Sequence, residues 1–263
     1  MKLAANLSLL YPGLDLPARM DAAARDGFKG VEILFPYDLA PQALADMLAA
    51  RGLALVLVNT PPGPQGEKGL AGLPGRTDDF RAAFARSLAV CRATGCPAIH
   101  VMAGQPGPQD ERADCLEVLA ENLRWAAPQA AEHGVTLTLE ALNRQDMPGY
   151  LYWLPEQAAE AIRAVGHDNV GLQFDLYHCQ KEGLPLARTL AALRPLVKHV
   201  QFAGANGRHE PDLDAPGVAP ALQALAASGY DGWVGCEYIP AGDTSAGLAW
   251  RARYAGLVAQ AAA

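Results

Sequence analysis

The sequence predicts an α/β fold, a (β/α)8 TIM barrel formed by a single domain over residues 1–263. Four short apolar runs each lead into an oxygen-bearing side chain: Glu140, Asp175, Gln201 and Glu237. These side chains are 35, 26 and 36 residues apart, and the segments between them have helical patterns. Eight strand–helix units over this length would average about 33 residues, which is the repeat of such a barrel.

The first half of the chain supplies four strand–helix units. The first helix is expected to begin near Asp15, whose side chain can cap it, and Pro17 is tolerated in its first turn. Gly52 should stop the second helix. The expected strands are 3–9, 31–34, 53–58 and 97–102, and the later expected helices are 41–51, 78–94 and 109–133.

The second half supplies the four units that carry the oxygen-bearing side chains. Pro128 lies inside the helical pattern 109–133 and is expected to kink or restart that helix. His178 follows Asp175 by three residues and is expected in the same loop. The expected strands are 135–139, 170–174, 197–200 and 233–236, and the expected helices are 155–165, 185–193, 218–228 and 244–259.

Residues 60–76 form an unusual segment after the third strand. They include four prolines and five glycines, a composition that cannot hold a helix or a central strand. Because loops that follow strands lie on the catalytic face of a barrel, we expect a mobile lid that excludes water from the site. A disordered excursion is the alternative.

The four strand-end side chains are expected to meet at one mouth of the barrel, because all its strands point the same way. Three unpaired carboxylates placed together repel one another and resist desolvation, and a divalent cation would remove this problem. All four side chains offer oxygen, which favours Mg²⁺ or Mn²⁺ over a structural zinc. One such acid alone would be a helix cap or a solvated carboxylate, whereas four in consecutive strands favour a metal site.

Two polar residues inside strands allow two interpretations each. Glu32 is either a further carboxylate of the site or a paired core residue. His199 precedes Gln201 by two residues and so shares its face of the strand. Of the two interpretations of His199, a hydrogen-bonded core residue is favoured over a residue of the site.

The composition restricts the class of protein. Residues are 51% hydrophobic and 19% charged, which suits one domain with a substantial core. No apolar run approaches a membrane span and no signal peptide precedes the first strand, so we expect a cytoplasmic protein without a membrane partner. Five cysteines without a CxxC pair fit reduced thiols. A net charge of −7 argues against nucleic acid and favours a small-molecule substrate, while a homo-oligomer is left open.

Six sequence blocks carry a family resemblance. They are HVMAG at 100–104, LEALN at 139–143, DLYHCQ at 175–180, HVQ at 199–201, GRHEP at 207–211 and GWVGCEY at 232–238. With these blocks in order, nearly the whole chain resembles the hydroxypyruvate isomerases of the xylose-isomerase-like barrel superfamily. Related ketose epimerases more usually carry histidine at the position of Gln201, which favours the isomerase branch. After Pro211 the family commonly has Gly-Thr-Gly-Glu, whereas this chain has Asp-Leu-Asp-Ala, which leaves the substrate fit of that loop open.

The resemblance implies the interconversion of hydroxypyruvate and 2-hydroxy-3-oxopropanoate (tartronate semialdehyde) through an enediolate. It implies that Glu140 and Glu237 are the acid/base pair and also ligands of one Mg²⁺ or Mn²⁺ ion. Asp175 and Gln201 would be ligands only.

The substrate-binding residues also follow from the resemblance. Arg208 is expected to pair with the substrate carboxylate through its planar fork, and the alternative is an ion pair with Glu210 that orders the loop. His178 would donate to a substrate oxygen. Asn59 and His100 complete this set, and the roles of His209 and Glu210 are left open.

Other activities fit parts of the same pattern. A 2-oxo-tetronate isomerase or a ketose 3-epimerase would need the same metal and paired glutamates. Phosphodiester hydrolysis on damaged DNA would need several histidine ligands and a basic face, and this acidic chain offers neither. A non-catalytic barrel that binds a sugar acid would have no reason to collect four metal-directed side chains.

Overall fold

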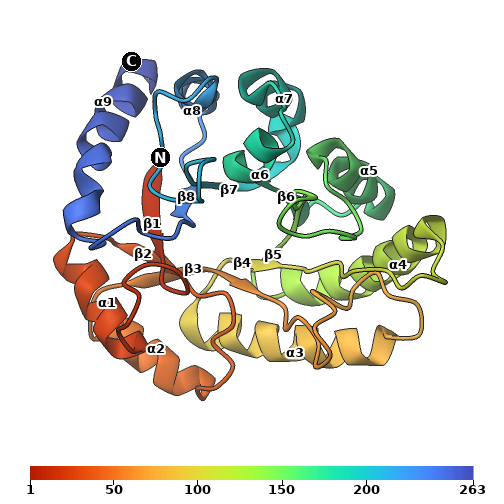
Figure 1. Ribbon diagram of the computed structural model, residues 1–263. Helices are drawn as coiled ribbons and strands as arrows, with labels where there is room; N and C mark the ends of the chain where they lie inside the picture. The colour runs from red at the N-terminus through yellow and green to blue at the C-terminus, as the bar shows by residue number, and fades with distance from the viewer. Residues whose placement is uncertain (263) are drawn as a thin grey trace.

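The computed structural model describes residues 1–262 and forms a closed barrel of eight parallel strands in chain order (Figure 1). Closure occurs between the first and last strands, where Leu3 is the register partner of Val234. The strands are β1 Lys2–Asn6, β2 Gly30–Glu32, β3 Ala54–Asn59, β4 Ala98–His100, β5 Thr136–Glu140, β6 Val170–Asp175, β7 Val197–Phe202 and β8 Trp233–Cys236. The predicted (β/α)8 barrel is confirmed.

Helices cover the outside of the barrel and connect its strands (Figure 1). Asp15 caps the first helix as expected, since its side chain accepts a hydrogen bond from the Ala18 N–H at 2.9 Å. The α-helices are α1 Leu16–Arg25, α2 Pro41–Ala49, α3 Thr77–Thr94, α4 Arg112–Ala131, α5 Pro155–Val165, α6 Leu176–Lys181, α7 Leu186–Leu193, α8 Val218–Ala227 and α9 Trp250–Ala262. Two short 3₁₀ helices, Arg194–Leu196 and Ala246–Ala249, precede β7 and α9.

The helix α6 was not predicted, and it corrects the expected position of His178. Asp175 ends β6 and also caps α6, because its Oδ1 accepts a hydrogen bond from the Tyr177 N–H at 2.7 Å. His178 therefore lies in the first turn of a helix rather than in a loop. Its direction is fixed by the end of β6.

Of the two effects expected of Pro128, a kink or a restart of the helix, the restart is wrong, because α4 continues through this proline to Ala131. Pro128 stands in the last turn, where the missing N–H costs only one helical hydrogen bond. Ala126, Ala127 and Ala130 are buried on both sides of it and hold this turn against the barrel. Tertiary packing thus outweighs the local effect of the proline.

The interior of the barrel changes from apolar to polar along the strands. Ala4, Val56, Leu57 and Ala98 form a buried apolar cluster together with the partly buried Trp233. Further toward the carboxyl ends of the strands, the buried side chains are polar, namely Asn6, Glu32, Thr138, Gln173, His199 and Gln201. This polar layer supports the mouth of the barrel from below.

The loop 60–76 has two parts. In its second part, Leu70, Ala71 and Leu73 are buried, and the Asn122 side chain donates a hydrogen bond to the Ala71 carbonyl at 2.8 Å. Residues 61–68 are more exposed. A cover for the site, if it moves, would therefore be limited to residues 61–68.

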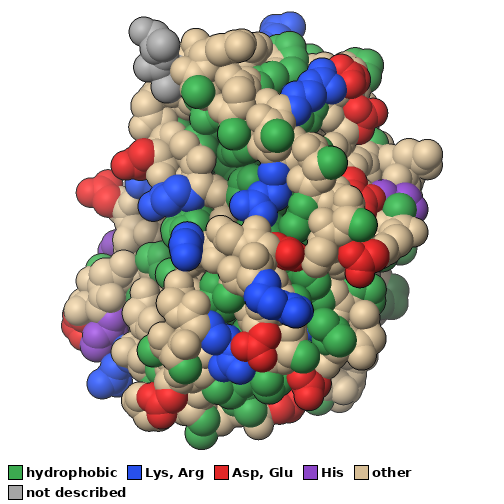
Figure 2. Space-filling view, turned by 90° about the vertical axis from the view of Figure 1, so that its left-hand side faces the viewer, with side chains coloured by type: hydrophobic (Ala, Val, Ile, Leu, Met, Phe, Trp, Pro, Cys, Tyr) green, Lys and Arg blue, Asp and Glu red, His purple; other side chains and the backbone are tan. Residues whose placement is uncertain are grey.

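The surface carries charges of both signs. On the face shown in Figure 2, Lys and Arg side chains alternate with Asp and Glu, with hydrophobic side chains between them. Within residues 1–262, no helix is long and apolar enough to cross a membrane.

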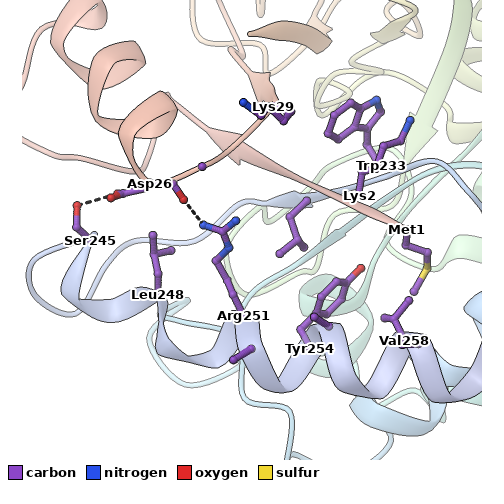
Figure 3. A pocket seen from close by; sticks show the side chains of 15 residues that line it. Met1, Lys2, Asp26, Lys29, Trp233, Ser245, Leu248, Arg251, Tyr254 and Val258 are labelled. Carbon is purple, nitrogen blue, oxygen red and sulfur yellow. Dashed lines mark hydrogen bonds between the residues drawn. The ribbon is translucent and has the colours of Figure 1, made fainter. Parts of the chain in front are cut away.

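A cavity of about 870 Å³ lies at the end of the barrel where the strands begin, against α9 (Figure 3). Asp26 accepts a hydrogen bond from the Ser245 hydroxyl at 2.7 Å, and its backbone carbonyl accepts one from Arg251 at 2.6 Å. Lys2 lies 4.6 Å from the centre of the Trp233 ring. Active sites of this fold lie at the opposite end, so the smaller cavity at the carboxyl ends of the strands is the candidate site.

The close packing inside the barrel can be tested at Gly235 of β8. A Cβ atom there would lie 2.1 Å from Oε1 of the buried Glu32 carboxylate. We expect Gly235→Ala to lower the free energy of unfolding by about 1–3 kcal/mol, because this carboxylate has no space to retreat. Thermal unfolding followed by circular dichroism measures the change.

The matched control is Gly256→Ala in the exposed face of α9, where a Cβ would meet nothing within 4 Å. Alanine is the better helix former, so this variant should gain about 1 kcal/mol. Equal melting temperatures for the two variants would contradict the packing described for Gly235.

Candidate active site

The four oxygen-bearing side chains predicted from the sequence lie at the carboxyl ends of their strands. Glu140 ends β5, Asp175 ends β6, and Glu237 directly follows β8. Gln201, in β7, is the register partner of both Asp175 and Gly235. All four side chains are buried.

Two carboxylate oxygens in this group have no hydrogen-bond partner among the described residues. They are Oε1 of Glu140 and Oδ2 of Asp175, and both lie 3.7 Å from Nε2 of His178. Ligand atoms of these three residues lie within 4.8 Å of one another. Buried carboxylate oxygens without partners suit a hard divalent cation, so the residues present fit the expected metal.

The hydrogen bonds of His178 decide its role in this group. Its Nδ1 accepts a hydrogen bond from the backbone N–H of Asn143 at 3.0 Å. The proton of the neutral ring is therefore on Nε2, which faces Glu140 and Asp175. A protonated nitrogen cannot ligate a metal, so His178 acts as a donor and the metal-directed atoms are the carboxylate oxygens.

A chain of buried hydrogen bonds holds Glu140 and Gln201 in place. Gln173 Nε2 donates to Glu140 Oε2 at 2.9 Å and to Gln201 Oε1 at 2.6 Å. The Thr138 hydroxyl donates to Gln173 Oε1 at 3.0 Å, which fixes the orientation of this amide. Sequence reasoning missed Thr138 and Gln173. Each precedes a predicted site residue by two positions, and this alternation could have identified them.

Glu32 is the paired core residue of the two interpretations, because it is fully buried and has three partners. It accepts hydrogen bonds from Asn6 Nδ2 at 3.0 Å and from Gln201 Nε2 at 2.9 Å, and it lies 2.6 Å from His199 Nε2. His199 is likewise a hydrogen-bonded core residue. This pair lies beneath the site and orients the Gln201 amide.

Arg208 pairs with Glu237. Its Nη2 lies 3.0 Å from Glu237 Oε1, and its Nε donates to the Glu237 backbone carbonyl at 3.3 Å. Its guanidinium also stacks on the Tyr177 ring, 4.8 Å from the ring centre. The alternative ion pair with Glu210 is wrong, since the Glu210 carboxylate instead accepts from the Ala241 N–H at 3.3 Å.

The loop that follows β7 is anchored away from the mouth. Nδ1 of His209 is hydrogen-bonded to the Ile239 carbonyl at 2.9 Å. Leu213 is buried, and Asp214 forms an ion pair with Arg253 of α9. None of the four residues that depart from the family pattern lines the cavity, and Asp214 contacts the outer helix instead.

The carboxyl groups of the site resist ionisation. Burial, followed by the negative charges of Glu237 and Asp175, raises the pKa of Glu140 well above its usual value. Burial also raises the pKa of Asp175 to about 6 and that of Glu237 to about 8, although Arg208 pulls both pKa values down. These groups hold protons at a pH where ordinary carboxyl groups have lost them.

The histidines of the site are neutral. Burial, and then the nearby His199, lowers the pKa of His100 to about 3. Burial, and then the charge of Arg208, lowers the pKa of His178 well below its usual value. His100 Nδ1 lies 3.3 Å from Glu140 Oε2. The positive charge in contact with these acids therefore comes from Arg208, which is paired with Glu237.

A cavity of about 240 Å³ opens at this mouth, smaller than most drug-sized pockets. Six of the residues that the sequence predicted line it: Asn59, His100, Glu140, His178, Arg208 and Glu237. Asp175 and Gln201 lie among the strand ends beside it. Pro62 and Lys68 belong to the predicted cover 60–76, and the lining residues that the sequence did not predict are Leu34, Phe35, Met102, Leu142 and Met147.

A closed barrel with buried carboxyl groups around a small cavity at its carboxyl end is typical of an enzyme that moves protons on a small polar substrate. The chain belongs to the xylose isomerase-like TIM barrel family, whose sequence profile matches residues 20–254.

Individual relatives cover nearly the whole chain. The 2-oxo-tetronate isomerase of Cupriavidus necator is 43% identical over 261 residues, which is 97% of this chain and 99% of that protein. The hydroxypyruvate isomerase of Escherichia coli is 35% identical over 256 residues, covering 97% of this chain and 99% of that protein. A crystal structure described as an AP endonuclease of family 2 from Brucella melitensis is 39% identical, with a TM-score of 0.92 over 96% of this chain and 98% of that chain. The isomerase class predicted from the sequence is confirmed.

The raised pKa values predict how pH affects the stability of the metal-free protein. A carboxyl group with a raised pKa in the folded state stabilises the fold at low pH, and this contribution is lost as the pH rises through the folded-state pKa. The melting temperature of metal-free protein should therefore fall between about pH 5 and pH 8, as Asp175 and then Glu237 ionise.

Mg²⁺ or Mn²⁺ should reduce this slope, because bound cations stabilise the ionised form. Glu140→Gln, measured in parallel without metal, should also reduce the slope, since it removes one of the three carboxyl groups. The same pH slope with cation, without cation and in the variant would contradict the assignment.

Proposed function

We propose that this enzyme interconverts hydroxypyruvate and 2-hydroxy-3-oxopropanoate. The observation that carries the proposal is the placement of two buried glutamates, Glu140 and Glu237, on the wall of one small cavity. Burial raises the pKa of both side chains, so each can hold a proton at a pH where an ordinary carboxyl group has lost it. The isomerase relatives support the same reaction class.

In this reaction one glutamate removes a proton from C3 of hydroxypyruvate, and the other delivers a proton to C2. The hydroxyl proton leaves the oxygen on C3 and the oxygen on C2 gains one, so the carbonyl and the hydroxyl exchange places. Glu140 and Glu237 come from β5 and from the end of β8, which lie apart in the ring, and can therefore approach different carbons of one substrate.

The neighbours of these glutamates prepare them for proton transfer. Gln173 occupies Oε2 of Glu140 at 2.9 Å, which leaves Oε1 without a partner and available to a substrate or a cation. Arg208 holds Glu237 at 3.0 Å and limits the rise of its pKa. His178 offers its Nε2 proton to a substrate oxygen and limits the charge that develops there.

The same side chains would hold one Mg²⁺ or Mn²⁺ ion: Glu140, Asp175, Gln201 and Glu237. When bound, this cation supplies positive charge beside the carbonyl and hydroxyl oxygens of the substrate and so stabilises the enediolate. The carboxylate oxygens without partners support this assignment.

The lining of the cavity favours a short substrate. Five apolar side chains in the lining offer no partner to additional hydroxyl groups: Leu34, Phe35, Met102, Leu142 and Met147. A three-carbon acid needs fewer polar partners and less of the 240 Å³ than a ketohexose would, so we rank ketose 3-epimerisation lower. Isomerisation of 2-oxo-tetronate, a four-carbon acid, is the second candidate and is supported by the relative from Cupriavidus necator.

We propose a small-molecule substrate rather than nucleic acid, despite the description of the related Brucella melitensis structure. Two of the three buried histidines near the site have other partners, since His199 contacts Glu32 and His178 accepts from Asn143, which leaves His100 alone as a histidine ligand for a zinc cluster. The net charge of −7 opposes binding to a phosphate backbone. A non-catalytic barrel that binds a sugar acid would gain nothing from buried carboxyl groups with raised pKa values.

We place the reaction in the cytoplasm, because all five cysteines are buried and unbridged. A homo-oligomer is compatible with the proposal.

The acid/base assignment predicts the behaviour of two conservative variants. Glu140→Gln and Glu237→Gln should each lower kcat by roughly 10²- to 10⁴-fold, because the amide cannot accept or deliver the proton. The assay follows solvent deuterium entering hydroxypyruvate, 2-oxo-tetronate and several ketoses in D₂O with Mg²⁺ or Mn²⁺. Deuterium exchange into a ketose but into neither oxo acid would contradict the proposed substrate class.

The control is Glu132→Gln on the exposed end of α4, which should keep wild-type kcat. Calorimetric titration with pyruvate, which lacks the reacting hydroxyl, checks that both site variants still bind an oxo acid. Near-normal turnover in both site variants would remove the acid/base assignment.

A further inference from the structure

We propose that Lys68, on the loop 61–68, binds the carboxylate of the substrate and thereby selects acids over neutral sugars. This inference rests on the proposed function of the same cavity and assigns a residue that sequence reasoning did not select. It also replaces Arg208 as the expected partner of the substrate carboxylate.

Arg208 already has partners within the site. Two of its three nitrogens contact Glu237, at 3.0 Å and 3.3 Å, and its flat face is covered by the Tyr177 ring. Turning this guanidinium toward a substrate would leave the Glu237 carboxylate buried without its partner, which is costly. Arg208 therefore compensates the charge of Glu237 rather than that of a substrate.

Lys68 has no ion-pair partner among the described residues. Its side chain lines the same cavity as Glu140 and Glu237. Within residues 1–262, its ammonium group forms no ion pair with any carboxylate, whereas Arg76 of the same loop is paired with both Glu67 and Asp79. An ammonium group on a flexible four-carbon stem can follow a small ligand and donate up to three hydrogen bonds.

The backbone around Lys68 is fixed by hydrogen bonds and has an unusual conformation. Both chain neighbours are anchored: the Glu67 carbonyl accepts from the Gln105 N–H at 2.9 Å, and the Gly69 N–H donates to the Pro62 carbonyl at 2.8 Å. Lys68 itself has a φ of 58°, a left-handed conformation that is strained for a non-glycine residue. Backbone strain of this kind is concentrated at ligand-binding sites.

Gly69 explains why the chain turns at this point. Its φ is 126°, and a Cβ atom would lie 2.3 Å from the Met102 carbonyl oxygen. The backbone can approach the end of β4 this closely only with glycine at this position. Lys68 is therefore held directly beside the cavity rim, next to Met102.

The charges in the cavity leave the carboxylate of the substrate without a positive partner other than Lys68. Glu140, Asp175 and Glu237 bring three negative charges when ionised, and Arg208 with one divalent cation would neutralise them. The carboxylate of hydroxypyruvate adds a further negative charge. Lys68 is the remaining cationic side chain in the cavity lining, because the lining histidines are neutral.

The position of Lys68 connects the loop 61–68 to the cavity. Residues 61–68 lack the buried apolar side chains that fix residues 70–73, and Pro62 and Lys68 both line the cavity. An ion pair between Lys68 and the substrate would hold this part of the loop against the bound acid and reduce its local opening.

The test compares Lys68→Met and Lys68→Arg with the wild-type enzyme on hydroxypyruvate and on dihydroxyacetone, in which a hydroxymethyl group replaces the carboxylate. Loss of a charged hydrogen bond should raise KM for hydroxypyruvate roughly 10- to 100-fold in Lys68→Met. Lys68→Arg should restore most of the affinity. Deuterium exchange into dihydroxyacetone should be equal in all three proteins.

A second readout does not depend on turnover. Hydrogen exchange of the backbone amides of residues 61–68 should slow when pyruvate is added to the wild-type enzyme, and it should not slow in Lys68→Met. The control variant is Lys198→Met, an exposed lysine of β7 outside the cavity, which should behave as wild type in both measurements.

The outcomes separate this proposal from the proposed function. If the wild-type enzyme turns over hydroxypyruvate and Lys68→Met keeps the wild-type KM, the role of Lys68 is overturned while the function stands. If no acid is turned over, the function fails, and the amide exchange with pyruvate still decides whether Lys68 binds a carboxylate. Equal loss of affinity for hydroxypyruvate and dihydroxyacetone would also overturn the role of Lys68.

Discussion

The burial of several carboxyl groups at one end of the barrel is the constraint on which the rest of the site depends. Glu140, Asp175 and Glu237 lie at or next to the ends of their strands, out of contact with bulk water, and the pKa of each is raised mainly by that burial. Such groups are stable together only when positive charge or protons compensate them. Arg208 supplies part of this charge, and a divalent cation suits the part that remains. The cost of burial thus produces groups that can exchange protons near neutral pH.

A buried polar layer makes this arrangement rigid. Gln173 connects Glu140 with Gln201, and Glu32 connects Gln201 with His199. These bonds run across strands from β2 to β7, so the closure of the barrel and the geometry of the site are parts of one network. Buried polar networks with satisfied partners specify one arrangement of side chains. The strands therefore hold the acids to a fixed position before any substrate arrives.

The two kinds of charge are carried by different parts of the fold. The acids lie at or next to strand ends and are held by hydrogen bonds. Arg208 and Lys68 lie in loops, and each has a left-handed backbone conformation. Loops vary more easily than barrel strands. The proton chemistry can then stay with the barrel while recognition of the substrate changes with the loops, which is consistent with a family whose members carry different substrate names on one fold.

The sequence by itself determined the barrel, the family and the residues at the strand ends. The strand pattern and the length of each strand–helix unit are local features that can be recognised in the sequence alone. It did not determine α6, which begins at the Asp175 cap, or the partners of Arg208 and Glu32. Glu32 and His199 are 167 residues apart, and only closure of the ring brings them to 2.6 Å. The composition of residues 60–76 predicted a loop over the site, but nothing in it singled out Lys68. Contacts between distant strands and loops follow from how the ring closes and packs, and that was decided by the tertiary structure alone.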